Sequence, residues 1–147
     1  MCRSMSPDKP EPGASFFDPG SHYRTLTLMI RNALQDLLDA TPGALACVLV
    51  EANGIPLDAV SATGNNADPT TMAIEVSVVV TAARRAATML DAGETREVVL
   101  SNRDFTAIAR TLPGDLLLVL GVKDDADVAV ARYRLRVAMP TIVAELA

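Results

Sequence analysis

The chain has no tryptophan, one histidine, two cysteines and only 3% aromatic residues among its 147 residues. With so few aromatic side chains, a hydrophobic core has to be built from Ala, Val, Leu, Ile and Met, whose small side chains let secondary-structure elements approach closely. Half of the residues are hydrophobic, which is enough for one domain with its own core and argues against two. The composition therefore predicts a single, tightly packed aliphatic domain.

The scarcity of histidine and cysteine excludes most nucleophilic and zinc chemistry. His22 lies at the edge of a Pro-rich segment, so no Ser-His-Asp or Cys-His pair can be assembled near the core. Cys2 lies in a polar tail, and Cys47, within ALACVLV, is expected to be a small buried residue rather than a nucleophile. GxxxxGK[ST] and GxGxxG motifs are also absent. We therefore expect no catalytic residue, no bound nucleotide and no cofactor.

One acidic cluster, DDAD at Asp124–Asp127, invites comparison with a metal site. It lacks the alternating ligands, the glycine and the terminal Glu of an EF-hand loop. Negative charge placed before a helix complements the positive end of the helix dipole. The cluster is therefore interpreted as a helix cap and no metal is expected.

The chain also lacks a basic surplus and long apolar runs. Its net charge of −5 argues against binding to a phosphate backbone. No segment approaches the ~20 apolar residues that span a bilayer, and the start MCRSMSPDKPEPGAS lacks the apolar centre of a signal peptide. We expect a cytoplasmic protein without membrane insertion or nucleic-acid binding. Residues 1–20 hold four of the nine prolines and are predicted to be a disordered tail, before a domain at 21–147.

The segment Thr41–Ala62 is the most informative part of the sequence. Two apolar strands, Leu45–Glu51 and Ile55–Ala62, flank Asn53-Gly54, and this dipeptide favours the type I′ turn of an antiparallel hairpin. A helix at Ser21–Asp39 is expected just before the hairpin. Its predicted core face contains residues that recur at helical spacing: Leu26, Ile30, Ala33 and Leu37, widened by Leu28, Leu34 and Leu38.

A second helix is predicted from Asp68-Pro69 to Asp91, although several of its β-branched residues favour a strand. The segment exceeds 20 residues without a turn residue, far longer than the usual strand of about 5–6 residues, and Asp68 with Pro69 forms a good helix start. Its predicted inner face consists of Met72, Val76, Val79, Ala83, Ala86 and Leu90. Its opposite face is almost as apolar and consists of Ile74, Val78, Thr81, Ala82 and Met89. A helix that is apolar all round needs burial on two sides, so we expect a homodimer, with a central helix in a larger core as the alternative.

Three strands and a last helix complete the predicted order. The strands are Glu94–Ser101, Asp104–Thr111 and Asp115–Val122, separated by turns at Asn102-Arg103 and Pro113-Gly114. The continuously apolar stretch in the last strand predicts burial on both faces. The helix from Asp125 or Ala126 to Leu146 repeats the four-three spacing, with Pro140 expected to kink or end it.

This order, together with LQDLLDATPGALACVLVEANGIPLDAVSA and the end Arg136–Leu146 with its RxxxPxIxxxL pattern, resembles the roadblock (dynein light chain) domain, particularly its bacterial members related to MglB. The resemblance implies a profilin-like α-β-β-α-β-β-β-α sandwich with a five-stranded antiparallel sheet in the order 2-1-5-4-3. It also implies a homodimer formed through the third strand and the middle helix. Within the predicted helix and strand, the residues assigned to this interface are Ile74, Val78, Thr81, Ala82, Val98 and Leu100.

The resemblance further implies a non-enzymatic platform for a Ras-like small GTPase, because MglB-type dimers stimulate hydrolysis by the GTPase MglA through remodelling of its switch regions. Three residues of the second helix, Glu75, Arg84 and Arg85, are the predicted partner contacts, although a solvated face also explains the two arginines. Two alternatives stay open. One is a scaffold without effect on GTP hydrolysis, and the other is a ligand-sensing module, against which the lack of convergent polar groups argues.

Overall fold

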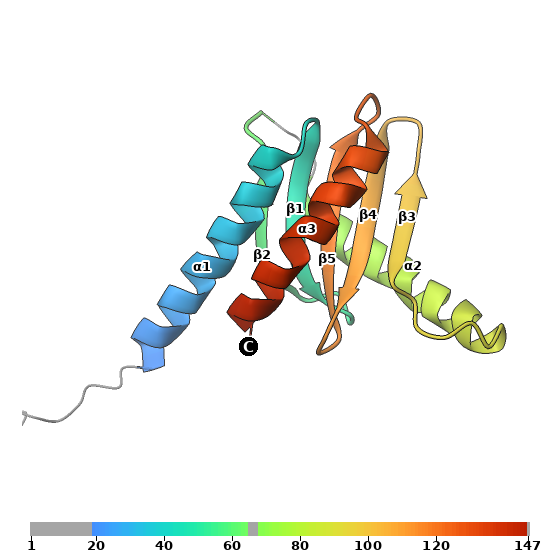
Figure 1. Cartoon of the computed structure of the whole chain (residues 1–147), viewed down its shortest axis with the longest axis horizontal. Helices are drawn as coiled ribbons and strands as arrows, with labels where there is room; N and C mark the ends of the chain where they lie inside the picture. The colour runs from blue at the N-terminus through green and yellow to red at the C-terminus, as the bar shows by residue number, and fades with distance from the viewer. Residues whose placement is uncertain (1–18, 65–67, 147) are drawn as a thin grey trace, which may run out of the picture.

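The computed structural model describes residues 19–64 and 68–146 and has eight helices and strands (Figure 1). In chain order these are α1 (Pro19–Ala40), β1 (Ala44–Glu51), β2 (Pro56–Ser61), α2 (Pro69–Met89), β3 (Glu97–Ser101), β4 (Phe105–Leu112), β5 (Leu116–Lys123) and α3 (Val128–Leu146). Most of the predicted tail lies outside the described residues, and α1 begins at Pro19 rather than at Ser21.

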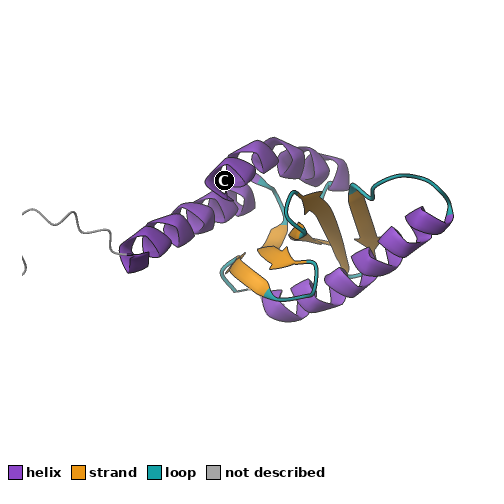
Figure 2. Ribbon diagram, turned by 90° about the horizontal axis from the view of Figure 1, so that it is seen from below, coloured by secondary structure: helices purple, strands orange, loops and turns teal. Residues whose placement is uncertain are grey.

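The five strands form one antiparallel sheet in the order β2-β1-β5-β4-β3. Helices α1 and α3 cover one face of the sheet and α2 covers the other, as Figures 1 and 2 show. Each face has its own aliphatic cluster, one between the sheet and α1 with α3, the other between the sheet and α2. The predicted fold class, element order and strand order are confirmed.

Strand β5 lies at the centre of the sheet and is buried on both faces, as predicted. Its residues Leu117–Leu120 are fully buried and alternate between the two clusters. Cys47 on the neighbouring strand β1 is also fully buried. Burial without a charged partner raises the pKa of its thiol to about 12, which makes the thiolate negligible at neutral pH. The prediction that Cys47 packs as a small apolar residue is confirmed.

The turn between β1 and β2 differs from the predicted type I′ geometry. Asn53 does not have a positive φ, whereas Gly54 has φ +93°. The Gly54 N–H donates to the Glu51 carbonyl over 2.8 Å, and the strand register shifts between Leu49 and Val50. A turn with ordinary φ values followed by a left-handed glycine also matches the twist of a hairpin. A Cβ at this position would also lie 3.1 Å from the Ser77 Oγ of α2, a tight contact that only a shift of the Ser77 side chain would relieve.

The helix prediction for the long β-branched segment is confirmed. Asp68 caps α2, its side chain accepting a hydrogen bond from the Thr70 N–H over 3.1 Å, and Pro69 occupies the first turn. In α1 the predicted core residues Ile30, Leu34 and Leu37 are buried, but the placement of Leu28 was wrong. Leu28 is 59% exposed, whereas Leu26, two residues earlier, packs against the core. Leu28 therefore lies on the side of α1 that is turned away from the core.

Helix α3 begins after Asp127, whose carboxylate accepts hydrogen bonds from the Ala129 and Val130 N–H groups at 3.0 and 3.2 Å. The acidic cluster therefore includes the predicted helix cap. The helix continues through Pro140 to Leu146, so the alternative that Pro140 ends it was wrong. Within the described part of the chain, no helix combines the length and the apolar character needed to cross a bilayer.

Candidate interaction surfaces

The outer face of α2 is the first candidate surface. Met72, Ala73, Val76, Ser77 and Val80 pack against the sheet, while the outer side chains of Ile74 and Val78 are 44% and 61% exposed. Thr81 and Ala82, which follow at helical spacing, are also exposed. No element among the described residues covers these side chains, so this apolar face is available to another chain.

The predicted inner face of α2 was wrong over its second half. Val79 and Ala83 are only half-buried, and Ala86 and Leu90 are exposed, with Leu90 at 76%. The reason is visible in Figures 1 and 2: α2 crosses the sheet obliquely, and its C-terminal half projects beyond it. Amphipathic spacing identifies which residues share a side of a helix but cannot show where the sheet beneath it ends.

Strand β3 forms an open edge beside α2. It is the terminal strand of the sheet, and the main packing of α2 lies across β1 and β2 at the opposite side. Val98 and Leu100 point to the α2 face of the sheet and remain half-buried. The other edge, β2, begins with Pro56, which has no N–H to donate and weakens further pairing there.

The three predicted partner contacts lie on two different surfaces. Glu75 and Arg85 are exposed to solvent. Arg84 instead turns toward the sheet, where its Nη1 lies 3.6 Å from the Asp115 carboxylate, and its side chain is only 33% exposed. The adjacent arginines therefore serve two different surfaces. Asp115 is held in the β4–β5 turn with a left-handed φ of +58°.

Arg84 lines an open groove of about 1070 Å³ between the projecting end of α2, the segment leading into β3 and the β4–β5 turn. The groove is lined by charged residues from segments far apart in the sequence: Arg84, Asp91, Glu94, Arg96 and Asp115. Sequence reasoning missed this convergence, because it arises from the overhang of α2 rather than from a motif. The argument that the chain lacks convergent polar groups was therefore incorrect.

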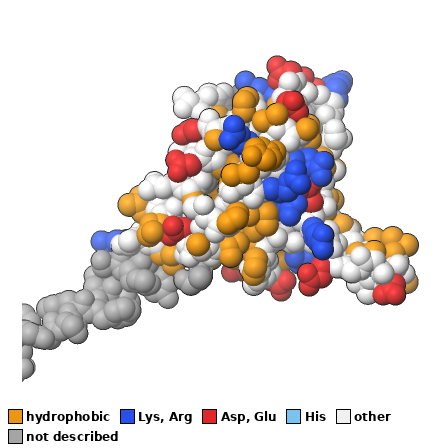
Figure 3. All heavy atoms as spheres, in the orientation of Figure 1, with side chains coloured by type: hydrophobic (Ala, Val, Ile, Leu, Met, Phe, Trp, Pro, Cys, Tyr) orange, Lys and Arg blue, Asp and Glu red, His pale blue; other side chains and the backbone are white. Residues whose placement is uncertain are grey.

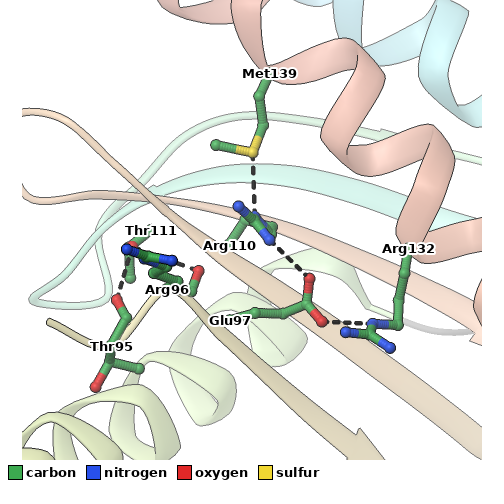
Figure 4. A network of polar contacts seen from close by, with 7 residues as sticks. All are labelled: Thr95, Arg96, Glu97, Arg110, Thr111, Arg132 and Met139. Atoms are coloured by element: carbon green, nitrogen blue, oxygen red, sulfur yellow. Dashed lines mark hydrogen bonds and ion pairs between the residues drawn. The ribbon is translucent and has the colours of Figure 1, made fainter. Parts of the chain in front are cut away.

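On the opposite face of β3, a buried carboxylate joins the edge strand to α3 (Figure 4). Glu97, whose side chain is 10% exposed, accepts a hydrogen bond from Arg110 Nη1 over 3.1 Å and another from Arg132 Nε. Arg110 Nε also contacts the Met139 Sδ at 3.2 Å. Burial alone raises the pKa of Glu97, but the hydrogen bonds and charges of the two arginines outweigh it and lower the pKa.

These surfaces are suited to protein contacts, and the described residues contain no metal-binding cluster of three or more His, Cys, Asp or Glu side chains. The fold is a helix and sheet sandwich with one uncovered helix face and one open sheet edge. The sequence model of the Roadblock/LC7 domain matches residues 30–120, more than half of the chain. The chain belongs to the Roadblock/LC7 family.

Solved structures of bacterial proteins share this fold. The Roadblock/LC7 domain from Streptomyces avermitilis is 21% identical, with a TM-score of 0.69, over 78% of this chain and 94% of that one. The gliding protein MglB from Thermus thermophilus is 19% identical, with a TM-score of 0.74, over 92% and 96%. MglC from Myxococcus xanthus is 29% identical, with a TM-score of 0.60, over 80% and 98%. No protein with a curated sequence matches this chain significantly.

Proposed function

We propose that the protein is a cytoplasmic homodimer that serves as a platform for a Ras-like small GTPase and regulates its GTP hydrolysis. The observation that carries the proposal is the pairing of two uncovered surfaces, the outer face of α2 around Val78 and the open edge of β3. Two chains related by a two-fold axis would extend the sheet through β3 and lay one α2 against the other. Membership of the Roadblock/LC7 family supports the same arrangement.

A dimer of this kind would gain affinity from the pairing of edge strands and from the burial of apolar side chains. Pairing of edge strands satisfies backbone groups that otherwise face water. Burial of Ile74 and Val78 removes apolar surface from water, at about 25 cal/mol per Å². The half-buried Val98 and Leu100 lie next to the position that the partner's α2 would take, so the same association would also cover them.

The GTPase would contact α2 through charged groups at the margin of this surface. Arg85 lies one helical turn beyond Ala82 and is exposed, so it is available to acidic residues of a switch region. No nucleotide-binding loop is present in the sequence, and the proposed regulation acts on the partner's conformation. A scaffold that binds the GTPase without changing hydrolysis is the alternative outcome.

The test begins with the full-length protein as bait in a native lysate, with a non-hydrolysable GTP analogue or GDP added. Retention of a small GTPase only with the GTP analogue supports the platform. The retained GTPase is then purified and its hydrolysis rate is measured with and without the protein. A changed rate supports regulation, and an unchanged rate assigns the protein to the scaffold class. Absence of any small GTPase under both conditions would reject the proposal.

Arg85→Glu is expected to lower the affinity for the GTPase about tenfold, since reversing a charge at the margin of an interface costs roughly 1–2 kcal/mol. Arg84→Glu distinguishes the contribution of Arg84 from that of Arg85, because Arg84 lies in the groove near Asp115 and not on the outer face of α2. The matched control is Arg24→Glu, an exposed arginine on α1 at the other side of the sheet. Titration by fluorescence anisotropy measures all three, and an unchanged affinity for Arg85→Glu removes it from the site.

A further inference from the structure

One flank of α3 forms a basic surface beside the edge strand β3. Arg132 donates from Nε to the Glu97 carboxylate of β3, and Met139, seven residues later, contacts the Arg110 guanidinium of β4. Arg136 lies between these two positions, four residues after one and three before the other, so it shares their flank of α3. We call this surface the β3 flank, and its residues are Glu97, Val99, Arg110, Arg132 and Arg136.

The β3 flank has more positive charge than its single carboxylate balances. Both oxygens of Glu97 are already engaged, Oε2 by Arg110 and Oε1 by Arg132. Arg136 is exposed and forms no ion pair with any described residue, and the Arg132 side chain is 46% exposed. In Figure 3, basic side chains gather on this side of α3. Although the chain has a net charge of −5, the β3 flank is therefore a local basic surface that suits carboxylates.

The same face of strand β3 has no helix over it. Helix α1 packs mainly over β1 and β2, and α3 mainly over β4 and β5 (Figure 1). Each helix covers two strands, because two strand spacings of about 4.8 Å match the ~10 Å between packed helices. Among the described residues no helix remains for β3, the fifth strand. Val99, which shares the α3 face of β3 with Glu97, is accordingly 41% exposed.

The backbone of β3 specifies how a second copy would pair with it. The Asn102 N–H donates to the Phe105 carbonyl over 3.0 Å, so the even-numbered residues of β3 bond to β4. The N–H and C=O groups of the odd-numbered residues Glu97, Val99 and Ser101 therefore point to the open edge. Two antiparallel copies of β3 pair over the whole strand only when Val99 of one copy lies opposite Val99 of the other. In the proposed dimer, both Val99 side chains would then lie next to each other on the α3 face.

This pairing would form a central groove between the two α3 helices, because two bare β3 strands side by side are about 10 Å wide, the width of one packed helix. The walls of the central groove would be the two β3 flanks, and the two Val99 side chains would lie in the middle of its floor. We propose that the central groove docks one acidic amphipathic helix of a partner protein per dimer. The apolar stripe of that helix would cover Val99, and carboxylates on both sides of the stripe would face Arg132 and Arg136.

A protein helix fits the central groove better than a nucleic acid or a membrane. Grooves for single-stranded nucleic acids combine basic groups with aromatic side chains on which bases stack, and the β3 flank contains no aromatic residue. A lipid surface binds broad, exposed apolar faces, whereas the central groove would be concave and one helix wide. An apolar centre between two rows of arginines instead matches a helix whose apolar stripe is bordered by carboxylates.

The inference rests on the homodimer of the proposed function and not on its GTPase. The central groove would lie on the α3 face, and α2, to which the GTPase is assigned, lies on the opposite face of the sheet (Figure 2). One dimer could therefore bind the partner helix and the GTPase together. Sedimentation velocity of the wild-type chain is the first test. A monomer would reject both the dimer and the central groove, whereas with a dimer the groove stands or falls on the two measurements that follow.

Photo-crosslinking of the full-length protein in its native organism identifies the occupant. Ala129→p-benzoylphenylalanine places the crosslinker seven residues before Arg136, on the same flank of α3, and leaves the arginines unchanged. The matched control is Thr141→p-benzoylphenylalanine, an exposed position on the flank of α3 that faces α1. An acidic segment with apolar residues at helical spacing, crosslinked from position 129 and not from 141, supports the proposal. A basic or extended segment, a nucleic-acid or lipid adduct, a second copy of this chain, or no adduct above the control overturns it.

A synthetic peptide of the crosslinked segment is then titrated by fluorescence anisotropy, and one peptide should bind per dimer. Arg136→Glu should weaken binding at least about tenfold, since each dimer contains the substitution twice, and the loss should grow as the salt concentration falls. Arg134→Glu is the matched control on the other flank and should leave the affinity unchanged. Val78→Asp on α2 cannot contact the groove, but as a monomer it should lose peptide binding. One peptide per chain, an unchanged affinity of a dimeric Arg136→Glu variant, or full binding by monomeric Val78→Asp overturns the central groove.

Discussion

Substitution of Val78 by Asp gives the sharpest test of the proposed dimer. In one chain Val78 is 61% exposed, so a carboxylate at that position would face water and leave the fold intact. In the dimer the same side chain would be covered by the partner's α2. The substitution therefore separates association from folding.

The expected magnitude follows from burial. Full burial of a valine side chain contributes about 1.5–3 kcal/mol. Covering the exposed part of Val78 in the dimer would therefore contribute about 1–2 kcal/mol to association, and the substitution loses this contribution. A partly desolvated carboxylate without a partner costs about 1–3 kcal/mol more. A two-fold dimer contains the substitution twice, which gives about 4–10 kcal/mol. Even the lower value weakens dimerisation about a thousandfold.

Sedimentation velocity over a concentration series measures this effect. The wild-type chain should sediment as a dimer and Val78→Asp as a monomer at the same concentrations. Leu28→Asp is the matched control, because Leu28 is an equally exposed leucine on α1 and lies outside the proposed interface. Wild-type sedimentation of Val78→Asp, or a monomeric wild-type protein, would refute the reasoning.

Three further predictions concern the fold itself. The first uses a Cys2→Ser variant, in which Cys47 is the single cysteine. Cys47 should react with a soluble disulfide reagent at least about a thousandfold more slowly in the native protein than in urea, because its thiol is fully buried and has a pKa of about 12. Fast labelling of the native protein would contradict this. Glu97→Gln should lower the free energy of unfolding at pH 7 by about 1–3 kcal/mol in urea titrations, since it leaves two arginines without their carboxylate. Because the folded-state pKa of Glu97 is lowered, its contribution is present above the unfolded pKa and is lost as pH falls through the folded one, so the difference between wild type and variant should shrink in acid. The exposed Asp104→Asn control should show a much smaller loss, because water screens its ion pair with Arg103, and equal effects of the two would contradict the role of burial. Gly54→Ala should lower the free energy of unfolding by about 1–3 kcal/mol, because φ is +93° and the new Cβ would crowd α2. Differential scanning calorimetry measures this change, and an unchanged melting temperature would show that the turn adapts.

Most of the fold could be predicted because its signals are local. Asp68-Pro69 marks the start of α2, and the continuous apolar run of β5 marks a central strand. The antiparallel hairpin was also correct, but its turn geometry was not, since an Asn-Gly pair fits more than one turn type and Asn53 does not take the positive φ of a type I′ turn.

The candidate surfaces were only partly predictable. The outer face of α2 was identified because Ile74 and Val78 are apolar where a surface helix is normally polar. The groove beside Arg84 was missed, since it depends on α2 extending past the sheet, and periodicity contains no information about that. The ion-pair network of Glu97 was also missed, because Arg132 is brought to it from 35 positions away by the packing of α3 over the sheet.

The difference between the two sheet edges limits how many chains can assemble through them. A sheet with two equally adhesive edges can add chains indefinitely and form a fibre. Here Pro56 weakens the β2 edge while β3 stays open. In the proposed dimer, symmetric pairing of β3 with β3 would use both open edges at once and leave only the β2 edges, each starting with a proline, outside. Edge-to-edge growth of the sheet would then end at two chains, which would protect an aliphatic, β-branched sequence from amyloid-like polymerisation.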